Sequence, residues 1–466
     1  MVLENIYIQK TQPTFIIIGL GVSGLTCARH CIRNNYNIII LEKNKNLGGV
    51  WYNKTYPDVK LQTTKESYAF SDFSFYNNIS LYPSGNEVLD YLEDYANYHN
   101  ILQYTKFNSK VIQTNFNYEN EKWNVEYMLN NKKHVVKGDY LLIASGFYSD
   151  KLNTSSLLEN NSLINNKKIL SIKDFNNTKL NYNIFKDKNI CIIGNGPTGC
   201  DLTCLLHKYS PKNIKLLYRS ERWLFRRYLW NKLSTDKLLC RLFMKIAIKL
   251  PKFIYLVLII ISYYIIYIFS HGFFSFKIKS PLEPVTRKNL VLNENIIKYI
   301  TNNNIEYIKS KNIKIDNNYI HYNNNKITYD YCIIATGYIS DIEFLNMKNI
   351  PKLYNKIIHP EIPNCGFIGF SPSFNWVQVS ELQIQWYLEY LKQNIKNISK
   401  DEMYKDISFK IKNLSNKSYD YHDLSINAFD YCDSLAKDIK INLKYSKFNP
   451  KYWFNSPEHD LWSYKN

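Results

Sequence analysis

The chain has 466 residues, enough for two or three domains with large cores, and a formal net charge of +19. The charge is mostly lysine, which is abundant together with asparagine, isoleucine and tyrosine. We find no RNP, zinc or basic-helix motif, so nucleic acid is not an expected partner. The nine cysteines form no CxxC pair and the histidines lack metal-ligand spacing, so no metal site is expected. The odd number of cysteines and the absence of a secretory signal favour a reducing, intracellular compartment.

The first unit along the chain is an apolar strand followed by a glycine-rich turn. Phe15 to Ile18 precedes a GxGxxG sequence at residues 19–24, in the strand–turn–helix context in which this motif binds a dinucleotide. The first glycine makes the turn, the second lets the backbone approach a pyrophosphate, and the third lets helix and strand pack closely. The pyrophosphate lies at the helix N-terminus, where free N–H groups favour anions. The predicted contacts are Gly19, Gly21, Val22, Ser23 and Gly24.

Two features after this turn extend the predicted site. The next strand, Ile38 to Leu41, ends in Glu42, close to the spacing at which a carboxylate accepts from a ribose hydroxyl. A double glycine then lets the backbone press against a second phosphate or a flat ring, which adds Gly49, Val50 and Trp51 as predicted contacts. Residues 110–116 and 122–128 alternate in the way of a hairpin, and a buried strand is expected at 140–144.

A second GxGxxG turn, at residues 194–199, follows the apolar run Ile190 to Ile193. Two such turns, both behind apolar strands, indicate two dinucleotides on one chain and electron transfer between them. The strand after the second turn ends in Arg219 rather than an acid, which indicates the 2′-phosphate of NADP. Arg219 is also the first of five arginines between residues 219 and 241, out of eight in the chain. The predicted contacts here are Gly194, Gly196, Pro197, Thr198, Gly199 and Arg219.

Phe253 to Ser270 is a run of 18 residues without a charge, flanked by lysines. The run is long and apolar enough to span a membrane. A span would, however, divide the second dinucleotide domain between two compartments. We prefer a helix lying in the membrane interface, and a buried helix or lid remains the alternative. The expected location is the cytoplasm or the cytoplasmic face of an internal membrane, such as the endoplasmic reticulum.

In order and spacing these motifs resemble the flavin-containing monooxygenases, of the dimethylaniline monooxygenase type, and most of all the plant-type subgroup. The resemblance runs from about residue 14 to 462. Its FAD-side segments are 19–24, Glu42, 48–51, 61–65 and 70–73, and its NADPH-side segments are 194–199, Arg219 and Trp223. The motif Ala335-Thr336-Gly337-Tyr338 resembles the family's return to the FAD domain, and 358–363, 368–370 and 381–386 resemble its C-terminal half.

The resemblance implies an α/β fold of two Rossmann-like, three-layer dinucleotide-binding domains, with the NADPH domain inserted into the FAD domain. Residues 1–165 and 331–466 form the FAD-binding domain, and 166–330 form the NADPH-binding domain, with a hydrophobic insert at about 225–285. Thr336 and Gly337 join the cofactor contacts. Thr63, Thr64 and Lys65 are the candidate catalytic groups near the flavin.

The activity implied is that of an NADPH- and O2-dependent flavoprotein monooxygenase. NADPH reduces FAD, O2 adds at the flavin C4a position, and the hydroperoxide oxygenates a small soft nucleophile, either an amine nitrogen or a thioether sulfur. The cofactors expected are thus FAD and NADPH, with the organic nucleophile and O2 as the reacting partners. The cofactor carries this chemistry, and the protein orients the reactants and excludes water.

Two departures from the family pattern keep an alternative open. The fingerprint FxGxxxH is replaced at residues 165–171, where Ser171 stands in the place of the histidine. Thr64 stands where many members carry asparagine beside the flavin. Both changes bear on the coupling of NADPH oxidation to oxygenation of a substrate. An uncoupled NADPH oxidase that makes H2O2 is therefore the alternative. A disulfide reductase would need a cysteine pair after Gly48-Gly49, which is absent. The intact glycine turns argue against a protein that keeps FAD only for structure.

Overall fold

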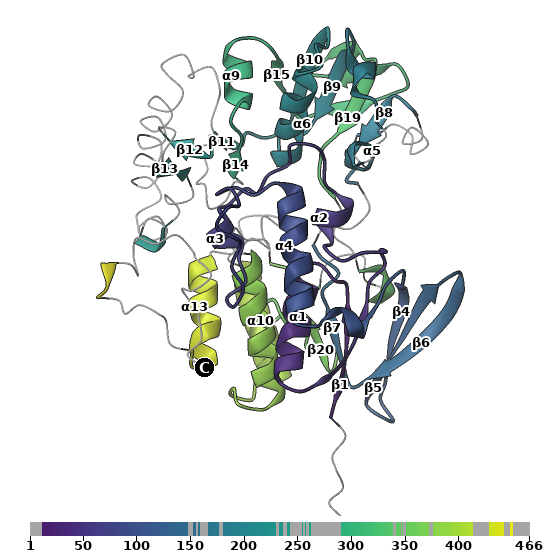
Figure 1. The fold of residues 1–466 in the computed structure, drawn as a ribbon, viewed down its shortest axis with the longest axis vertical. Helices are drawn as coiled ribbons and strands as arrows, with labels where there is room; N and C mark the ends of the chain where they lie inside the picture. The colour runs from purple at the N-terminus through teal and green to yellow at the C-terminus, as the bar shows by residue number, and fades with distance from the viewer. Residues whose placement is uncertain are drawn as a thin grey trace, which may run out of the picture.

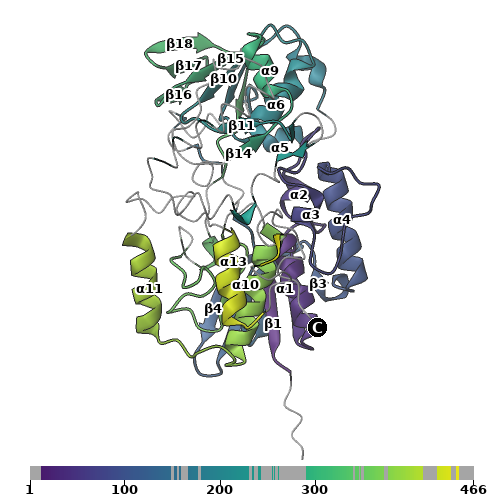
Figure 2. The same ribbon diagram turned by 90° about the vertical axis from the view of Figure 1, so that its left-hand side faces the viewer.

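The fold consists of two parallel sheets in two domains stacked along the long axis of the molecule (Figures 1 and 2). It is taken from a computed structural model of the chain. The structure describes residues 12–147, 152–154, 157–158, 166–176, 180–229, 233–235, 240–242, 254, 257, 261, 290–338, 342–345, 347, 351–371, 376–412, 428–441 and 448–450.

The first parallel sheet has the strand order β20-β7-β1-β2-β3. These strands are β1 (Thr14–Ile18), β2 (Asn37–Leu41), β3 (Thr105–Lys106), β7 (Tyr140–Ile143) and β20 (Cys365–Phe367). β1, β2 and β7 are nearly continuous apolar runs, as expected for strands covered on both faces. Cys365 pairs with Leu141 although the two are 224 positions apart in the chain. The second domain is therefore inserted between two neighbouring strands of the first.

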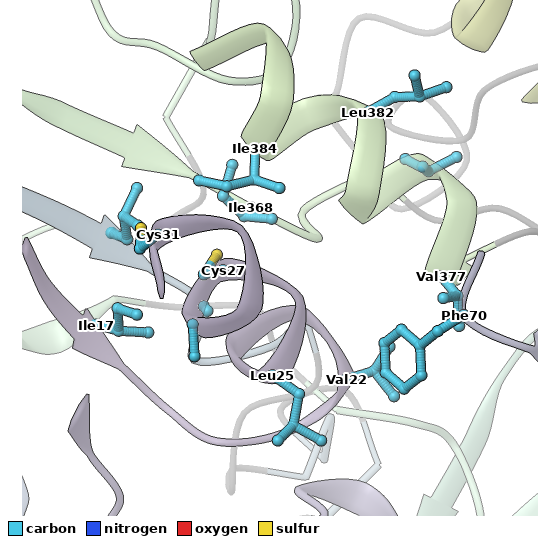
Figure 3. Packing of buried hydrophobic residues seen from close by; sticks show 14 of the residues in the cluster. Ile17, Val22, Leu25, Cys27, Cys31, Phe70, Ile368, Val377, Leu382 and Ile384 are labelled. Atoms are coloured by element: carbon cyan, nitrogen blue, oxygen red, sulfur yellow. The ribbon is translucent and has the colours of Figure 1, made fainter. Parts of the chain in front are cut away.

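Alternate side chains of β1 point into two different cores, which makes this domain three-layered. Ile17 packs on one face against Leu25, Cys27 and Cys31 of α1 (Val22–Arg33), as Figure 3 shows. Burial raises the pKa of both cysteine thiols, which act here as small apolar groups. The other helices of this domain are α2 (Val50–Asn53), α3 (Lys65–Tyr68), α4 (Gly85–Tyr98), α10 (Trp376–Leu391), α11 (Lys400–Lys412) and α13 (Ala428–Asp438).

The opposite face of the first sheet is covered by an antiparallel sheet. Its strands are β4 (Lys110–Asn117), β5 (Lys122–Leu129) and β6 (Lys132–Gly138). The hairpin predicted at 110–116 and 122–128 is confirmed, with Phe116 opposite Trp123. Trp123, together with Val125 of the same strand, packs against Ile16 of β1. The alternation seen in the sequence thus marks a strand with one face on the core.

The second parallel sheet has the order β15-β10-β9-β19-β8. Its strands are β8 (Ile169–Ser171), β9 (Asn189–Ile193), β10 (Asn213–Tyr218), β15 (Glu306–Lys309) and β19 (Tyr331–Ile334). β19 pairs with both β9 and β8, so the predicted domain boundary at 330/331 is too early by one strand. The helices of this domain are α5 (Ile172–Phe175), α6 (Pro197–His207) and α9 (Ile296–Thr301). A three-stranded sheet consists of β16 (Ile313–Ile315), β17 (Tyr319–Tyr322) and β18 (Asn325–Thr328). Two further pairs are β11 (Trp223–Phe225) with β14 (Leu290–Leu292) and β12 (Tyr228–Leu229) with β13 (Leu233–Ser234).

The apolar run from Phe253 to Ser270 lies outside the described residues except at three positions. Ile254, Val257 and Ile261 are helical, and their side chains are exposed. Within the described part of the chain, no helix combines the length and the apolar character needed to cross a membrane.

A network of charged groups joins α1 and α10 to the segment 70–73. Arg29 of α1 donates to Asp72 through Nε at 2.8 Å and Nη2 at 2.6 Å. The Ser71 N–H and hydroxyl donate to Oε1 of Glu381, on α10, at 3.1 and 3.0 Å. Burial raises the pKa of Glu381 to about 7, and the Ser71 hydrogen bonds and the charge of Arg29 only partly oppose it. Burial thus favours the neutral form of this acid inside the first domain.

This pKa predicts that Glu381→Gln stabilises the protein at high pH. The carboxyl ionises near pH 4.5 in the unfolded chain but near 7 when folded. Stability is therefore full below that range and is lost as the pH rises through it, by about 3 kcal/mol in total. Glutamine keeps the acceptor oxygen and cannot ionise. Thermal unfolding should thus show a higher Tm for the variant at pH 8 but not at pH 4.

The matched control is Glu389→Gln on the same helix, because the pKa of Glu389 is lowered. This control should give no gain in Tm at pH 8. Equal pH dependence of the wild type and Glu381→Gln would contradict the assignment.

Candidate active site

The first glycine turn is shaped by contacts that leave no room for side chains. Gly19 has a φ of +98°, and a Cβ on Gly24 would lie 2.0 Å from the Gly19 carbonyl oxygen. The first and third glycines are thus needed for the junction between β1 and α1 to close. Gly21 stands against Gly49, where an added Cβ on Gly49 would come 3.1 Å from the Gly21 Cα. The double glycine predicted to press on a cofactor therefore also presses on the first turn.

Glu42 holds the first turn in place from the end of β2. Its carboxylate is buried and accepts the Leu20 N–H at 2.7 Å, and it also accepts the main-chain and side-chain N–H groups of Asn44 at 2.9 and 2.7 Å. A carboxylate has about four acceptor positions, so capacity remains for a ribose hydroxyl. Glu42 is thus part of the turn's architecture and not a solvated charge at a strand end.

The next predicted contacts lie around α2 and the start of α1. Val50 is exposed at the first position of α2. The indole N–H of Trp51 donates to the Tyr68 hydroxyl at 2.6 Å, which ties α2 to α3. Ser23 is buried, with its hydroxyl 3.1 Å from that of Ser380 on α10.

The second turn repeats the close packing but leaves its middle glycine open. Gly194 has a φ of +112°, and a Cβ on Gly199 would lie 1.8 Å from the Gly194 carbonyl oxygen. A Cβ on Gly196 would meet nothing within 4 Å. This space lies at the start of α6, where Pro197 occupies the first turn and Thr198 follows. It is a cradle in which a pyrophosphate can approach the backbone.

The cationic candidate Arg219 and the aromatic candidate Trp223 of the second domain lie in different surroundings. Arg219 directly follows β10, and its side chain is exposed. Trp223 is buried in β11, within the core of the domain. Ser171, at the altered fingerprint, forms a capping box with Asp174 at the start of α5, and Asn165 lies outside the described residues.

The three catalytic candidates are not equivalent. Thr63 and Thr64 are both buried, and the Thr64 hydroxyl donates to that of Ser67 at 3.2 Å. The Lys65 ammonium donates to the carbonyl oxygens of residues 76, 77 and 79 at 3.1, 3.4 and 2.8 Å. These bonds anchor the loop at residues 76–79, and the catalytic role of Lys65 stays a prediction. The sequence could not foresee these bonds because the acceptors are main-chain atoms.

Thr336 and Gly337 lie where the chain returns from the second domain. The Thr336 hydroxyl donates to the Asn153 carbonyl at 2.8 Å, and the Asn153 N–H donates to the Gly337 carbonyl at 3.0 Å. The outgoing and returning segments therefore run side by side. A Cβ on Gly337 would meet nothing within 4 Å, so space remains beside this crossing.

Sequence reasoning missed a set of polar side chains between the two domains. Tyr56 and Gln62 reach from the first domain to Asp201 and to the backbone of Leu292 in the second. Asp201 had one visible signal, because it is the single acid in helix α6. Its partner Tyr56 is 145 positions away in the chain, and no local pattern joins the two.

Two parallel sheets, each with a glycine turn at the end of its central strand, define an α/β oxidoreductase that binds two dinucleotides. A family model described as FMO-like, flavin-binding monooxygenase-like, matches residues 13–449, so the chain belongs to that family. It is an FAD-dependent NADPH monooxygenase, with FAD and NADPH as its cofactors. The residues present fit both groups, because Gly21 and Gly196 offer bare backbone at helix N-termini.

Several known proteins are similar over most of their length. Probable flavin-containing monooxygenase 1 of Arabidopsis thaliana is 23% identical, over 94% of this chain and 93% of that protein. Flavin-containing monooxygenase 5 of Mus musculus is 24% identical, over 90% and 81%. Among solved structures, S-allyl-L-cysteine S-oxygenase from Allium sativum shares the fold with a TM-score of 0.62 at 18% identity, covering 95% of this chain and 90% of that one. A steroid monooxygenase bound to NADP does so with a TM-score of 0.66 at 15% identity, covering 92% and 98%.

The geometry of the second turn predicts opposite effects for two alanine substitutions. Gly199→Ala places a methyl group inside the strand–helix junction and should cost at least about 2 kcal/mol of stability. Gly196→Ala has room, and its φ of −71° suits alanine, so Tm should not change. It should still raise the KM for NADPH about tenfold, because the methyl group displaces a phosphate from its N–H donors. Thermal unfolding and steady-state kinetics test both, and a destabilised Gly196→Ala would contradict the cradle.

Proposed function

We propose that this enzyme oxygenates a soft nucleophile, an amine nitrogen or a thioether sulfur. When bound, the flavin supplies the redox chemistry, through hydride uptake from NADPH and a C4a-hydroperoxide. The observation that carries the proposal is the pair of buried hydroxyl groups, Thr63 and Thr64, on the segment between the two dinucleotide turns. Buried, neutral hydroxyl groups suit oxygen transfer to a neutral nucleophile, because burial excludes water. The fold shared with a garlic S-oxygenase supports sulfur as one acceptor.

An uncoupled NADPH oxidase is the second candidate, and two observations favour it. The Thr64 hydroxyl already donates to Ser67, and Ser171 at the altered fingerprint is engaged in a helix cap. Both hydroxyl groups are thus engaged with other side chains of this protein. Reduced flavin would then return its electrons to O2 as H2O2.

Rapid mixing of NADPH-reduced enzyme with O2 separates the two candidates. A long-lived absorption band of an oxygenated flavin, which decays faster when a thioether or tertiary amine is added, is the expected result. Direct return to oxidised flavin, with one H2O2 formed per NADPH, would overturn the monooxygenase proposal in favour of the oxidase.

We also propose that Arg219 binds the 2′-phosphate of NADPH. A charge-assisted hydrogen bond to phosphate is worth about 1.5–3 kcal/mol, so Arg219→Ala should raise the KM for NADPH about 10- to 100-fold and leave NADH almost unchanged. Lys212→Ala, just before the other end of β10, is the matched control and should change neither. Equal losses for both nucleotides would remove Arg219 from the phosphate site.

We propose that the segment 253–270 rests on the cytoplasmic face of an internal membrane. Ile254, Val257 and Ile261 support this, because exposed apolar side chains at spacings of three and four share one helix face. Flotation of the purified protein with phospholipid vesicles should bring it to the lipid fraction. Replacing the three residues by serine should leave it behind with FAD still bound. A wild type that stays in the aqueous fraction would refute the contact.

A further inference from the structure

Between the two domains lies a buried polar network for which neither dinucleotide turn accounts. The Tyr56 hydroxyl donates to Oδ2 of Asp201 at 2.9 Å, and the Asn293 amide donates to Oδ1 at 2.6 Å. Tyr56 and Asp201 are each 7% exposed, and Asn293 is 6% exposed. Tyr56 belongs to the first domain, and the other two belong to the second. One oxygen of the Asp201 carboxylate thus bonds across the domain boundary to Tyr56, and the other bonds to Asn293 within the second domain.

Stability alone does not explain an acid at this place. Burial raises the pKa of Asp201 to about 6, although Arg227 and the two hydrogen bonds favour the ionised form. Asp58 also faces this group, and its charge favours the neutral form. A buried carboxylate is costly, and an apolar contact of the same size would bind the domains at least as firmly. The carboxylate instead provides two directional hydrogen bonds, and these fix two partners at defined positions.

On the first-domain side, the network continues directly to residues 61–65, which we call the flavin-side segment. The Leu61 carbonyl accepts from Arg227 Nε at 3.3 Å. Gln62 then uses both ends of its amide on Leu292 of β14, accepting the N–H at 2.7 Å and donating to the carbonyl at 3.2 Å. Thr63 and Thr64 follow at once in the chain. The path from Tyr56 to these threonines is thus held to the second domain at three successive points.

The second-domain side leads to the NADPH turn. Asp201 lies on α6, two residues after Gly199, and the Tyr56 hydroxyl also interacts with the side chain of Thr198 within the turn itself. The same helix that receives the pyrophosphate therefore carries the acid that holds Tyr56. A shift of the helix start would move Tyr56, and with it the segment beside the flavin.

We propose that Tyr56, Asp201 and Gln62 are positioning residues that fix the NADPH turn relative to the flavin-side segment, so that the nicotinamide is delivered to the flavin for hydride transfer. The inference rests on the two cofactors and not on the proposed substrate. In the step, a hydride leaves the nicotinamide with its electron pair, NADPH becomes NADP+, and the flavin is reduced. None of the three residues gives or takes a proton.

An exposed contact nearby provides a matched control. Lys208, also close to α6, pairs with Asp58, two residues from Tyr56, but these side chains are 54% and 56% exposed. Exposed ion pairs contribute little to rigidity. Lys208→Gln therefore breaks a bridge between the same two domains and leaves every hydrogen bond of the buried network in place.

The test is anaerobic mixing of the FAD-loaded enzyme with increasing NADPH, which needs neither substrate nor oxygen. For Tyr56→Phe and Asp201→Asn, flavin reduction at saturating NADPH should slow at least about tenfold, while half-saturation and FAD content stay near wild type. Lys208→Gln should match the wild type. The double variant should be no slower than the slower single variant, because both remove the same contact. Wild-type reduction rates in both variants, with only a lower Tm, would overturn the proposal.

A second measurement tests, without turnover, whether the NADPH turn and residues 61–65 are linked. Hydrogen–deuterium exchange on the FAD-loaded wild type should show that NADP+ slows exchange of amides at residues 61–65 as well as 194–200. In Tyr56→Phe, which removes one oxygen and keeps the ring, protection should persist at 194–200 and be lost at 61–65. Equal protection at 61–65 in both proteins would contradict the proposal, even if Asp201→Asn does not fold.

Discussion

The close approach of a helix to a strand at each glycine turn is the constraint on which the structure depends. At both turns the third glycine lies so near the first glycine's carbonyl that any side chain would overlap it. This contact brings the N-termini of α1 and α6 to the ends of β1 and β9, where their free N–H groups can meet a pyrophosphate. The rest of each domain, from the apolar strands to the helices that cover them, keeps this junction rigid.

Around that constraint the protein places its few buried charges at joints between segments. Glu42 fixes the first turn, Glu381 fixes the segment 70–73, and Asp201 fixes the second domain on the first. Each carboxylate accepts from donors of a different chain segment. Such groups cost free energy to bury, and in return they define relative position more sharply than apolar contacts do.

The sequence was sufficient for the local part of this design. The apolar strands, both glycine turns, the acid after β2 and the β4–β5 hairpin all follow from patterns a few residues long. The strand β19 pairs between β9 and β8 in the second sheet, although the boundary at 330/331 gives its residues to the first domain. The hydrogen bonds of Lys65 could not be predicted because its partners are carbonyl groups, which every residue has. Tyr56, Gln62 and Asp201 escaped because their meaning depends on contacts across the domain boundary.

The paired crossing between the domains has a mechanical consequence. Two separate connections would let the domains slide as well as turn, but here the outgoing and returning segments are tied together at Asn153, Thr336 and Gly337. The two segments act as a single connection, and rotation about it is the least restricted relative movement of the domains. Because the hydrogen bond between Tyr56 and Asp201 lies away from this crossing, it opposes rotation of one domain about the crossing.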